Sequence, residues 1–259
     1  MRRMTARVAV TRTVALAAML VVTTACGTGP STGNTAGKQT TLTVSAAASL
    51  TETFTDLAHR FEHDNPGVTV SLNFGGSAQL AQQIISGAPV DVFASASQTT
   101  MDQVTDAGRA SGTPKVFVRN VLTIAVPPGN PAGVTGLADL GRDSLRLAVC
   151  LPEVPCGAAA QKLFAAAGVT ARPDTLEEDV RGVLTKVELG EVDAGLVYRT
   201  DVRAAGSRVQ GIDFPEQTRV VNSYPVVAVS KSPIAERFVA FVLSDTGRTV
   251  FSRAGFQQP

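Results

Sequence analysis

From residue 41 onward, short apolar runs typical of β-strands alternate with longer segments whose apolar residues recur at helical spacing. Residues 41–46 (TLTVSA) resemble a strand, and the segment that follows places four apolar residues on one helical face: Leu50, Phe54, Leu57 and Phe61. Such alternation, repeated along a chain, predicts an α/β fold in which mostly parallel sheets are flanked by helices.

The same alternation continues toward the C-terminal end, with Gly and Pro residues at many of the breaks. Strands are predicted at residues 68–74, 90–97, 120–126, 145–150 and 194–200, and a pair of strands at 219–230. Helices are predicted at residues 77–87, 99–107, 157–168, 177–190, 232–244 and 246–256.

Charge and composition exclude one class of partner. The 259 residues carry a formal net charge of +1, and only 5% of them are aromatic. A near-neutral chain lacks the basic surface that binds nucleic acid, and few aromatic side chains are available to stack on bases. We therefore expect no nucleic-acid partner, and a globular protein of one large or two modest domains.

The first 25 residues have the layout of a signal peptide: a basic start, an apolar stretch too short to span a bilayer, and small residues before Cys26. A Cys in this position resembles a bacterial lipobox. Cys26 is therefore predicted to carry a lipid that anchors the exported protein to the outer face of the cytoplasmic membrane. Thr23 stands where that pattern prefers Leu, and simple secretion is the alternative. From Cys26 to residue 40 the chain is small and polar, as in a flexible tether.

The chain has three cysteines, an odd number for an exported protein. If Cys26 carries the lipid, Cys150 and Cys156 remain, and the segment between them (LPEVP) contains two prolines. Such a short loop between the two cysteines favours a disulfide in an oxidising compartment. The bond would contribute roughly 2–3 kcal/mol in the chain-entropy model. Two separate buried thiols are the alternative.

Four predicted helices begin at joints built from small or polar residues: AAAS at 46–49, FGGS at 74–77, VPCG at 154–157 and EEDV at 177–180. Helix N-termini present unpaired N–H groups and a partial positive charge, so several that converge would bind an anion. Ser49 and Ser77 add hydroxyl donors. Tyr198 ends a predicted strand, at the sheet edge where ligands bind in open α/β folds.

Each of these residues also has a purely structural interpretation. Ser49 and Ser77 are suitable N-caps, and most serines before helices do only that. Cys156 can be half of a disulfide, and Tyr198 can be a core tyrosine with a satisfied hydroxyl. The acidic residues before Val180 suit any helix N-terminus. The four joints point to a specific function only when they are considered together.

As a set, the motifs resemble a known family. AAASL, FGGSxxL, GAPxDVFxSAS, VPxG, EDVRGVL and VDAGLVYxxD follow one another, over residues 41–256, in the order found in the periplasmic molybdate-binding proteins of ABC importers. The resemblance implies a two-lobed Venus flytrap fold of the periplasmic-binding-protein type, in which the tetrahedral oxyanion is held between the lobes. It implies a transported ligand, no cofactor, and molybdenum held only through its oxygens.

The family's ligand positions fall on five residues of this chain. Ser49 and Ser77 match the hydroxyl and backbone donors of the first lobe. Val180 matches a backbone N–H donor, and Tyr198 matches the phenolic donor of the second lobe. Cys156 stands where the family commonly has Ala and donates from the backbone, so the substitution should preserve binding, although a disulfide there could reshape the loop.

We place lobe one at residues 41–121 plus 223–259 and lobe two at 122–222. The resemblance implies a monomer that captures molybdate, with tungstate as a second ligand, and delivers it to an ABC permease in the membrane. The motifs supply neutral donors and no obvious carboxylate acceptor, so hydrogen phosphate should be rejected because its proton would lack a partner. Rejection of sulfate would depend on the size of the cavity.

Other functions remain as alternatives. A sulfate- or thiosulfate-binding protein of the same fold is the nearest. A ferric-ion binder would need paired tyrosines, and the other tyrosine is Tyr224. A secreted serine hydrolase is remote, because neither candidate serine lies in a G-x-S-x-G elbow, and we expect no enzyme. His59 and His63 share a helical face, but two ligands do not make a metal site.

Overall fold

The computed structural model describes residues 39–215 and 220–259, all within one compact unit from Gly37 to Pro259. The predicted signal peptide, Cys26 and nearly all of the predicted tether lie outside the described residues. Within the described ranges, no helix combines the length and apolar character needed to cross a membrane.

Strands and helices alternate along the chain. The strands are β1 (Thr40–Ala47), β2 (Val68–Gly75), β3 (Val92–Ala94), β4 (Lys115–Val126), β5 (Leu147–Cys150), β6 (Thr175–Glu177), β7 (Ala194–Tyr198), β8 (Gln210–Ile212) and β9 (Val221–Ala228). The α-helices are α1 (Thr51–Asp64), α2 (Ser77–Ile85), α3 (Gln98–Asp106), α4 (Pro155–Ala167), α5 (Val180–Glu188), α6 (Arg199–Ala205), α7 (Pro233–Val242) and α8 (Asp245–Ala254). Short 3₁₀ helices lie at Ala48–Leu50, Leu137–Gly141 and Gly206–Arg208.

The strands form one continuous path of pairings, in the order β2-β1-β3-β9-β4-β7-β5-β6, with β8 paired to β4. β1 pairs in parallel with β2 and β3, and β5 pairs in parallel with β6 and β7. β4 and β9 pair antiparallel with each other and with their other neighbours. The α/β class is therefore confirmed, with two parallel groups of strands joined by an antiparallel pair.

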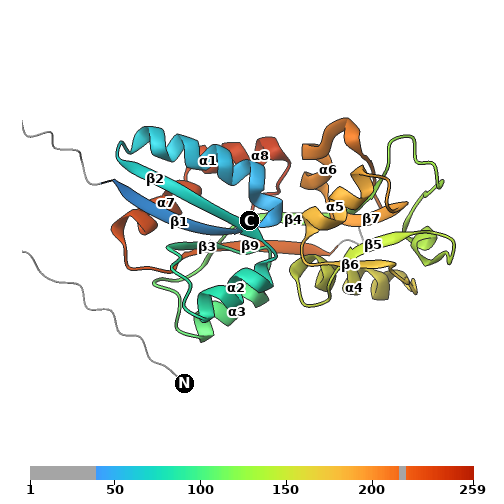
Figure 1. The fold of residues 1–259 in the computed structure, drawn as a ribbon, viewed down its shortest axis with the longest axis horizontal. Coiled ribbons are helices and arrows are strands. Elements are labelled where there is room, and N and C mark those ends of the chain that lie inside the picture. The colour runs from blue at the N-terminus through green and yellow to red at the C-terminus, as the bar shows by residue number, and fades with distance from the viewer. Residues whose placement is uncertain (1–38, 216–219) are drawn as a thin grey trace, which may run out of the picture. The chain divides into compact units, whose positions relative to one another are not determined.

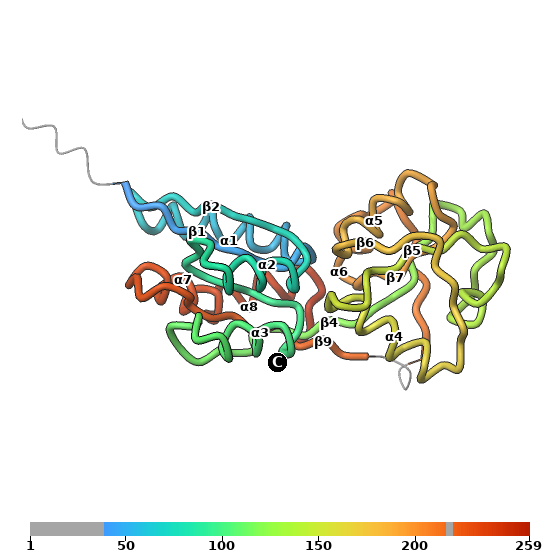
Figure 2. Tube along the Cα trace, turned by 60° about the horizontal axis from the view of Figure 1, so that its bottom comes forward, coloured from blue at the N-terminus to red at the C-terminus, as the bar shows by residue number. Residues whose placement is uncertain are grey.

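This pairing divides the sheet into two halves that β4 and β9 connect (Figures 1 and 2). We call the part with β1–β3, α1–α3, α7 and α8 the first half, and the part with β5–β8 and α4–α6 the second half. In the first half α1 and α8 cover one face of the sheet and α2 and α3 the other (Figure 1). In the second half α5 and α6 lie on one face and α4 on the other (Figure 1).

Burial follows the place of each strand in the sheet. β3, β5 and β7 are buried along their whole length, because helices cover both faces. β2 lies at the end of the strand order and alternates between exposed and partly buried residues. The first half is also held by a cluster of aromatic rings, in which Phe54 contacts three others: Phe117, Phe238 and Phe251. Its members come from both ends of the described chain, so the C-terminal helices complete this core.

Several predicted elements differ from the structure: β4 starts five residues before the predicted strand, and Arg199 and Thr200, predicted in a strand, begin α6. The pair of strands predicted at 219–230 is wrong, because Val221–Ala228 forms the single strand β9. The helix predicted from residue 177 begins later: Glu177 ends β6, and α5 starts at Val180. Asp179 causes the delay, since its side chain accepts hydrogen bonds from the N–H groups of the second and third helical residues and so fixes the N-cap.

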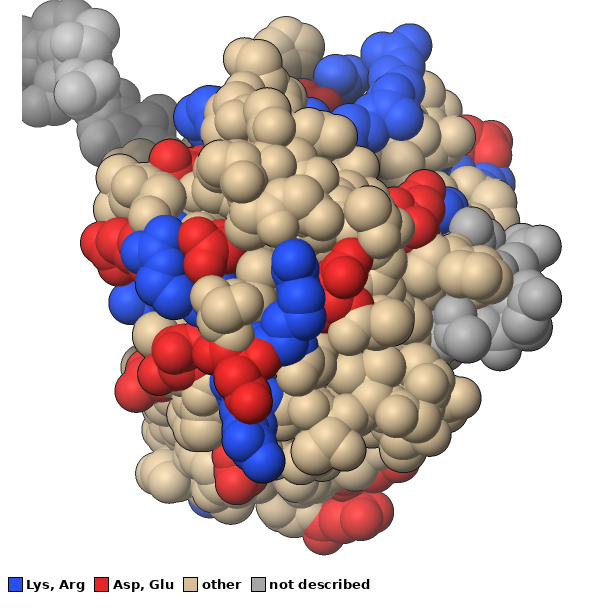
Figure 3. Space-filling view, turned by 90° about the vertical axis from the view of Figure 1, so that its right-hand side faces the viewer, with Lys and Arg blue, Asp and Glu red and all other residues tan. Residues whose placement is uncertain are grey.

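The exposed charges of the second half are mixed in sign. Figure 3 shows basic and acidic side chains interspersed over the end of the molecule that carries this half. Several are paired there, including Arg146 with Asp193 and Arg208 with Glu188. This face shows no single-sign patch, in keeping with the near-neutral net charge of the chain.

Candidate functional site

The structure brings the five predicted ligand residues together around one small cavity of about 20 Å³. Its lining consists of thirteen residues: Ala47, Ala48, Ser49, Gly75, Gly76, Ser77, Ala96, Val154, Pro155, Cys156, Asp179, Val180 and Tyr198. These come from the C-terminal ends of strands and the helix starts that follow them, in both halves of the sheet. A volume of this size holds an ion of a few atoms and excludes an organic ligand.

Ser49 and Ser77 do not act as N-caps. Ser49 lies in the 3₁₀ turn before α1, and Ser77 is the first residue of α2, with no side-chain cap bond at either start. The Ser49 hydroxyl lies 2.9 Å from the phenol oxygen of Tyr224, and the Ala96 N–H donates to the Ser77 oxygen over 3.0 Å. The N-cap interpretation of both serines is therefore wrong.

The two helix starts of the second half present backbone donors to the cavity. Val180 is the first residue of α5, and Asp179 caps the two N–H groups that follow it, over 2.8 and 3.0 Å. Cys156 is the second residue of α4, after Pro155, which has no N–H to offer. The N–H groups of Val180 and Cys156 are thus the first ones available at their helices.

Next to Cys156, the backbone of α4 lies very close to the backbone that follows β5. A Cβ atom built on Gly157 would lie 1.9 Å from the carbonyl oxygen of Leu151, so only glycine fits there. In the structure Cys150 and Cys156 are paired, with their Cα atoms 5.7 Å apart, a separation that a disulfide accommodates. The loop between β5 and α4 is therefore held close to the strand that precedes it.

Tyr198 ends β7 and is almost completely buried, at 1% exposure. Its N–H donates to the Asp201 carboxylate over 2.9 Å, and its phenol oxygen lies 3.0 Å from the amide nitrogen of Asn222. Burial raises the pKa of the Tyr198 phenol well above its usual range. The hydroxyl therefore keeps its proton at neutral pH and remains a donor.

Asp201 is a buried carboxylate one turn of helix away from the cavity lining. Burial raises its pKa from 3.8 to about 7. The Tyr198 N–H and the nearby Arg181 oppose this rise in pKa, whereas Glu52 and Asp179 add to it. The group is thus close to half protonated at neutral pH, and its charge depends on pH where the protein works.

Contacts between the halves close the rim of the cavity. Gly76 approaches the second half so closely that a Cβ atom there would lie 2.3 Å from the carbonyl oxygen of Glu178. Glu52 on α1 and Arg181 on α5 form an ion pair across the two halves. The described conformation therefore has both halves in contact around the cavity.

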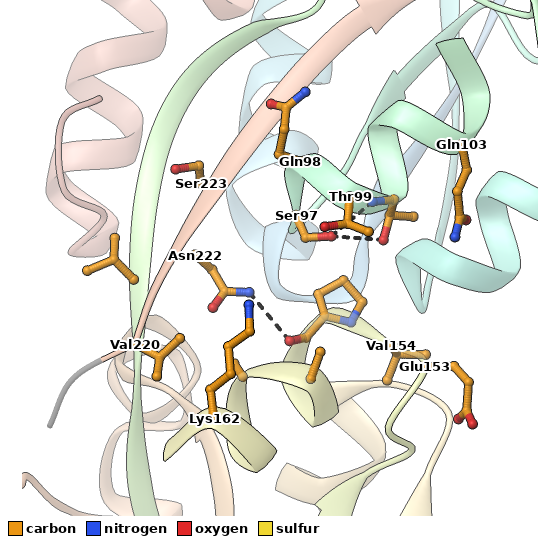
Figure 4. Close-up of a pocket in the computed structure, with 15 residues that line it drawn as sticks. Ser97, Gln98, Thr99, Gln103, Glu153, Val154, Lys162, Val220, Asn222 and Ser223 are labelled. Atoms are coloured by element: carbon orange, nitrogen blue, oxygen red, sulfur yellow. Dashed lines mark hydrogen bonds between the residues drawn. The ribbon is translucent and has the colours of Figure 1, made fainter. Parts of the chain in front are cut away.

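A larger cavity, of about 270 Å³, contains none of the five predicted residues. It lies between the start of α3, the start of α4 and the first residues of β9, and its polar lining includes Ser97, Gln98, Lys162 and Asn222 (Figure 4). Its size exceeds what a tetrahedral inorganic ion needs, and the five predicted ligand residues line the smaller cavity instead. We therefore assign the candidate site to the smaller one.

The described residues hold no group of three or more His, Cys, Asp or Glu side chains that could bind a metal ion. His59 and His63 lie on α1, where His63 contacts the neighbouring Asp64 at 3.0 Å. Three of the cavity residues carry hydroxyls, Ser49, Ser77 and Tyr198, one is acidic, Asp179, and the others are small or apolar. Such a set suits an oxyanion bound through its oxygens and does not suit a bare cation.

Sequence reasoning missed four polar residues at or behind the site: Asp179, Asp201, Asn222 and Tyr224. Asp179 lies in the cavity lining, and its carboxylate accepts the N–H groups of Arg181 and Gly182 as the N-cap of α5. Asn222 and Tyr224 are buried residues with polar groups in the strand β9, which ends in the apolar run Val226–Ala228. These polar groups next to an apolar run were the available signal, and the two residues occupy alternate positions, so both face the same side of β9.

The comparisons with known proteins agree with this geometry. The model of the bacterial extracellular solute-binding protein family matches residues 42–257. The chain is 39% identical over 251 residues to the molybdate-binding protein ModA of Mycobacterium tuberculosis, covering 94% of this chain and 96% of that protein. It is 32% identical over 228 residues to YvgL of Bacillus subtilis, a putative ABC transporter substrate-binding lipoprotein, covering 85% of this chain and 87% of that one.

Two solved structures show the same fold. The periplasmic molybdate-binding protein of Azotobacter vinelandii superposes with a TM-score of 0.74 at 21% identity, covering 84% of this chain and 99% of that one. The sulfate-binding protein SubI of Mycobacterium tuberculosis also gives a TM-score of 0.74, at 19% identity, covering 85% and 87%. The two-lobed periplasmic-binding-protein fold is confirmed, and the fold alone does not choose between the two ions.

The family matched by the chain consists of solute-binding proteins, which carry a transported ligand rather than a cofactor and are not enzymes. The match extends over nearly the whole described region, including every residue of the cavity. Fold, cavity and sequence identity thus agree. This chain is a member of the bacterial extracellular solute-binding protein family.

Proposed function

We propose that this protein captures molybdate, and tungstate with it, outside the cytoplasmic membrane and delivers it to an ABC importer. One observation carries the proposal: helix starts from both halves and the residues Ser49, Ser77 and Tyr198 line a single cavity of about 20 Å³. The 39% identity to a molybdate-binding protein over nearly its full length supports the choice of ion.

The site binds the dianion with neutral donors. We assign Ser49, Ser77 and Tyr198 as hydroxyl donors, and Cys156 and Val180 as backbone N–H donors. Hydrogen bonds to a charged group contribute about 1.5–3 kcal/mol each. Several such bonds exceed the roughly 12 kcal/mol of nanomolar affinity and leave a surplus that offsets desolvation and closure.

The two halves act as lobes that close on the ion. We place lobe one at residues 41–121 plus 223–259 and lobe two at 122–222, with β4 and β9 as the connection. The contacts of Gly76 with Glu178 and of Glu52 with Arg181 support a closed conformation in which both lobes reach the cavity. The chain acts as a monomer, since the site needs no residue from a second copy.

The exported protein is held at the membrane by a lipid on Cys26, after removal of a signal peptide of 25 residues. A relative of this chain is named a lipoprotein, which supports this anchoring. In the oxidising exterior, Cys150 and Cys156 form a disulfide. Mass spectrometry of residues 27–259 would find the intact chain lighter by two hydrogens than the reduced chain, and equal masses would contradict the bond.

Sulfate is the second candidate ion, because a sulfate-binding protein shares the fold at the same TM-score. Isothermal titration of residues 27–259 with molybdate, tungstate, sulfate and phosphate in turn decides between them. Tight binding of the first two ions with weak binding of sulfate supports the proposal. A preference for sulfate would replace the ion and keep the fold, and no heat with any of the four would refute the assignment of the site.

A further inference from the structure

Asn222 occupies a place that no ligand position explains. Its side chain extends from the start of β9 and is 7% exposed, and its amide nitrogen lies within reach of three acceptors. These are the carbonyl oxygen of Ala96 at 3.0 Å, the phenol oxygen of Tyr198 at 3.0 Å and, more weakly, the carbonyl oxygen of Pro155 at 3.5 Å. Figure 4 shows the side chain directed toward the start of α4.

The orientation of this amide follows from its partners. Ala96 and Pro155 offer carbonyl oxygens, which accept hydrogen bonds and cannot donate. The group that faces them must therefore be the NH₂ of Asn222 and not its oxygen. One hydrogen points to Ala96 and the other to Tyr198, so the phenol oxygen of Tyr198 is an acceptor in this contact.

The direction of that bond determines what Tyr198 can do with its own proton. Because the amide occupies a lone pair of the phenol oxygen, the O–H must point elsewhere. Its neighbour in the structure is the hydroxyl of Tyr224, which in turn lies 2.9 Å from the Ser49 hydroxyl. An oxyanion in the cavity is a stronger acceptor than a neutral phenol, so the proton turns toward it.

We infer that Asn222 is a positioning residue for oxyanion binding, which holds the Tyr198 hydroxyl as an acceptor on one side so that it donates into the cavity on the other. The inference rests on the proposed function, in which Tyr198 contacts the ion. The same amide joins three segments around the cavity: the end of β3, the start of α4 and the end of β7. It therefore orients the donor only when both halves are in place.

A double-mutant cycle on residues 27–259, which contain the whole compact unit, tests this role. The four proteins are the wild type, Tyr198→Phe, Asn222→Leu and the double variant, each titrated with molybdate. Leu has the same heavy-atom branching as Asn but cannot donate a hydrogen bond. We expect Asn222→Leu to weaken binding ~10-fold in the wild type and less than ~3-fold in the Tyr198→Phe background, because the amide acts through the phenol.

A matched control separates positioning from stability. Asn65 is also a buried Asn whose amide donates to a carbonyl, that of Phe61, over 2.7 Å. It lies at the far end of α1, about 21 Å of helix from the start of that helix near the cavity. Asn65→Leu should lower the melting temperature and leave molybdate affinity within ~2-fold of the wild type.

The outcomes distinguish this inference from the proposed function. Equal weakening by Asn222→Leu in both backgrounds would overturn the inference while the site remains. Unchanged affinity of Tyr198→Phe would also overturn it, because the amide would have no donor to position. Absence of molybdate binding by the wild type would refute the proposed function itself. If Asn222→Leu does not fold, Asn222→Ala enters the same cycle with the same expectation.

Discussion

The Ser49 hydroxyl contacts Tyr224 within the protein and, in the proposed function, also binds the ion. Its oxygen lies 2.9 Å from the Tyr224 phenol, and the alanines at 46–48 leave no side chain large enough to cover it. Ser49→Ala should weaken molybdate binding ten-fold or more, since a hydrogen bond to a charged group contributes about 1.5–3 kcal/mol. Isothermal titration measures the loss. Unchanged affinity with a lower melting temperature would mean that Ser49 only supports Tyr224.

Asp201 makes the stability of the protein depend on pH. Its pKa rises from 3.8 to about 7 on folding, so the folded state binds this proton more tightly than the unfolded state. The stabilisation from that proton is full below pH 3.8 and is lost as the pH rises through about 7. Charged groups near it act in both directions, with Arg181 lowering the pKa and Glu52 and Asp179 raising it.

Asp201→Asn should therefore stabilise the protein at pH 8.5, by up to a few kcal/mol, and change its stability little at pH 4. The substitution keeps an oxygen that accepts the Tyr198 N–H. Melting temperatures of both proteins across this range measure the effect. A constant difference between the two proteins at all pH values would contradict a titrating Asp201.

Among the elements, the start of α2 packs closely against the residues just before α5. Gly76 has no room for a side chain, because a Cβ atom would lie 2.3 Å from the Glu178 carbonyl oxygen. Its neighbour Gly75 has such room, with no atom closer than 3.5 Å. Gly76→Ala should thus weaken molybdate binding at least ~10-fold by holding the two helix starts apart, whereas Gly75→Ala should weaken it less than ~3-fold.

Equal affinities of the two glycine variants would contradict a close approach of these helix starts. The melting temperature of the ligand-free protein is the second measurement. Gly76 adopts φ −61° and ψ 127°, an extended conformation open to Ala, so its substitution adds no backbone strain within the first half. The loss should therefore appear in binding and hardly in unfolding.

Elements and cavity residues differ in how far the sequence predicts them. Periodicity identifies α1 and β2, because their apolar residues follow the spacing of one buried face. Small residues at the joints between strands and helices predict three of the helix starts that line the site. The hydrogen-bond partners of the site residues cannot be predicted in this way. Asn222 and Tyr224 are more than 20 residues in sequence from the hydroxyls they contact. Pairings of that kind depend on which strands become neighbours, which local patterns do not encode.

Across the whole molecule, the Glu52–Arg181 ion pair links α1 of the first half to α5 of the second. Both side chains are partly exposed, at 49% and 30%, so salt screens the attraction. Glu52→Gln should weaken molybdate binding about two- to five-fold at low salt and less at 0.5 M salt. The melting temperature of the ligand-free protein should hardly change.

The matched control for this pair lies within one half. Asp56 and Arg60 form an ion pair one turn apart on α1. Asp56→Asn removes a similar attraction without affecting contact between the halves, so molybdate affinity should stay the same at every salt concentration. An equal, salt-independent effect of both substitutions would rule out a contribution of the Glu52–Arg181 pair to closure.

β9 has a further consequence for how an ion leaves. Asn222 and Tyr224 lie two residues apart on a strand that also connects the halves. By the lobe bounds proposed above, Asn222 and Tyr198 belong to lobe two and Ala96 to lobe one, so parting of the lobes would break the bond of the amide to Ala96, which sets its orientation, and leave its bond to Tyr198. The hold of the Tyr198 hydroxyl on the proposed ion would then weaken as the lobes open.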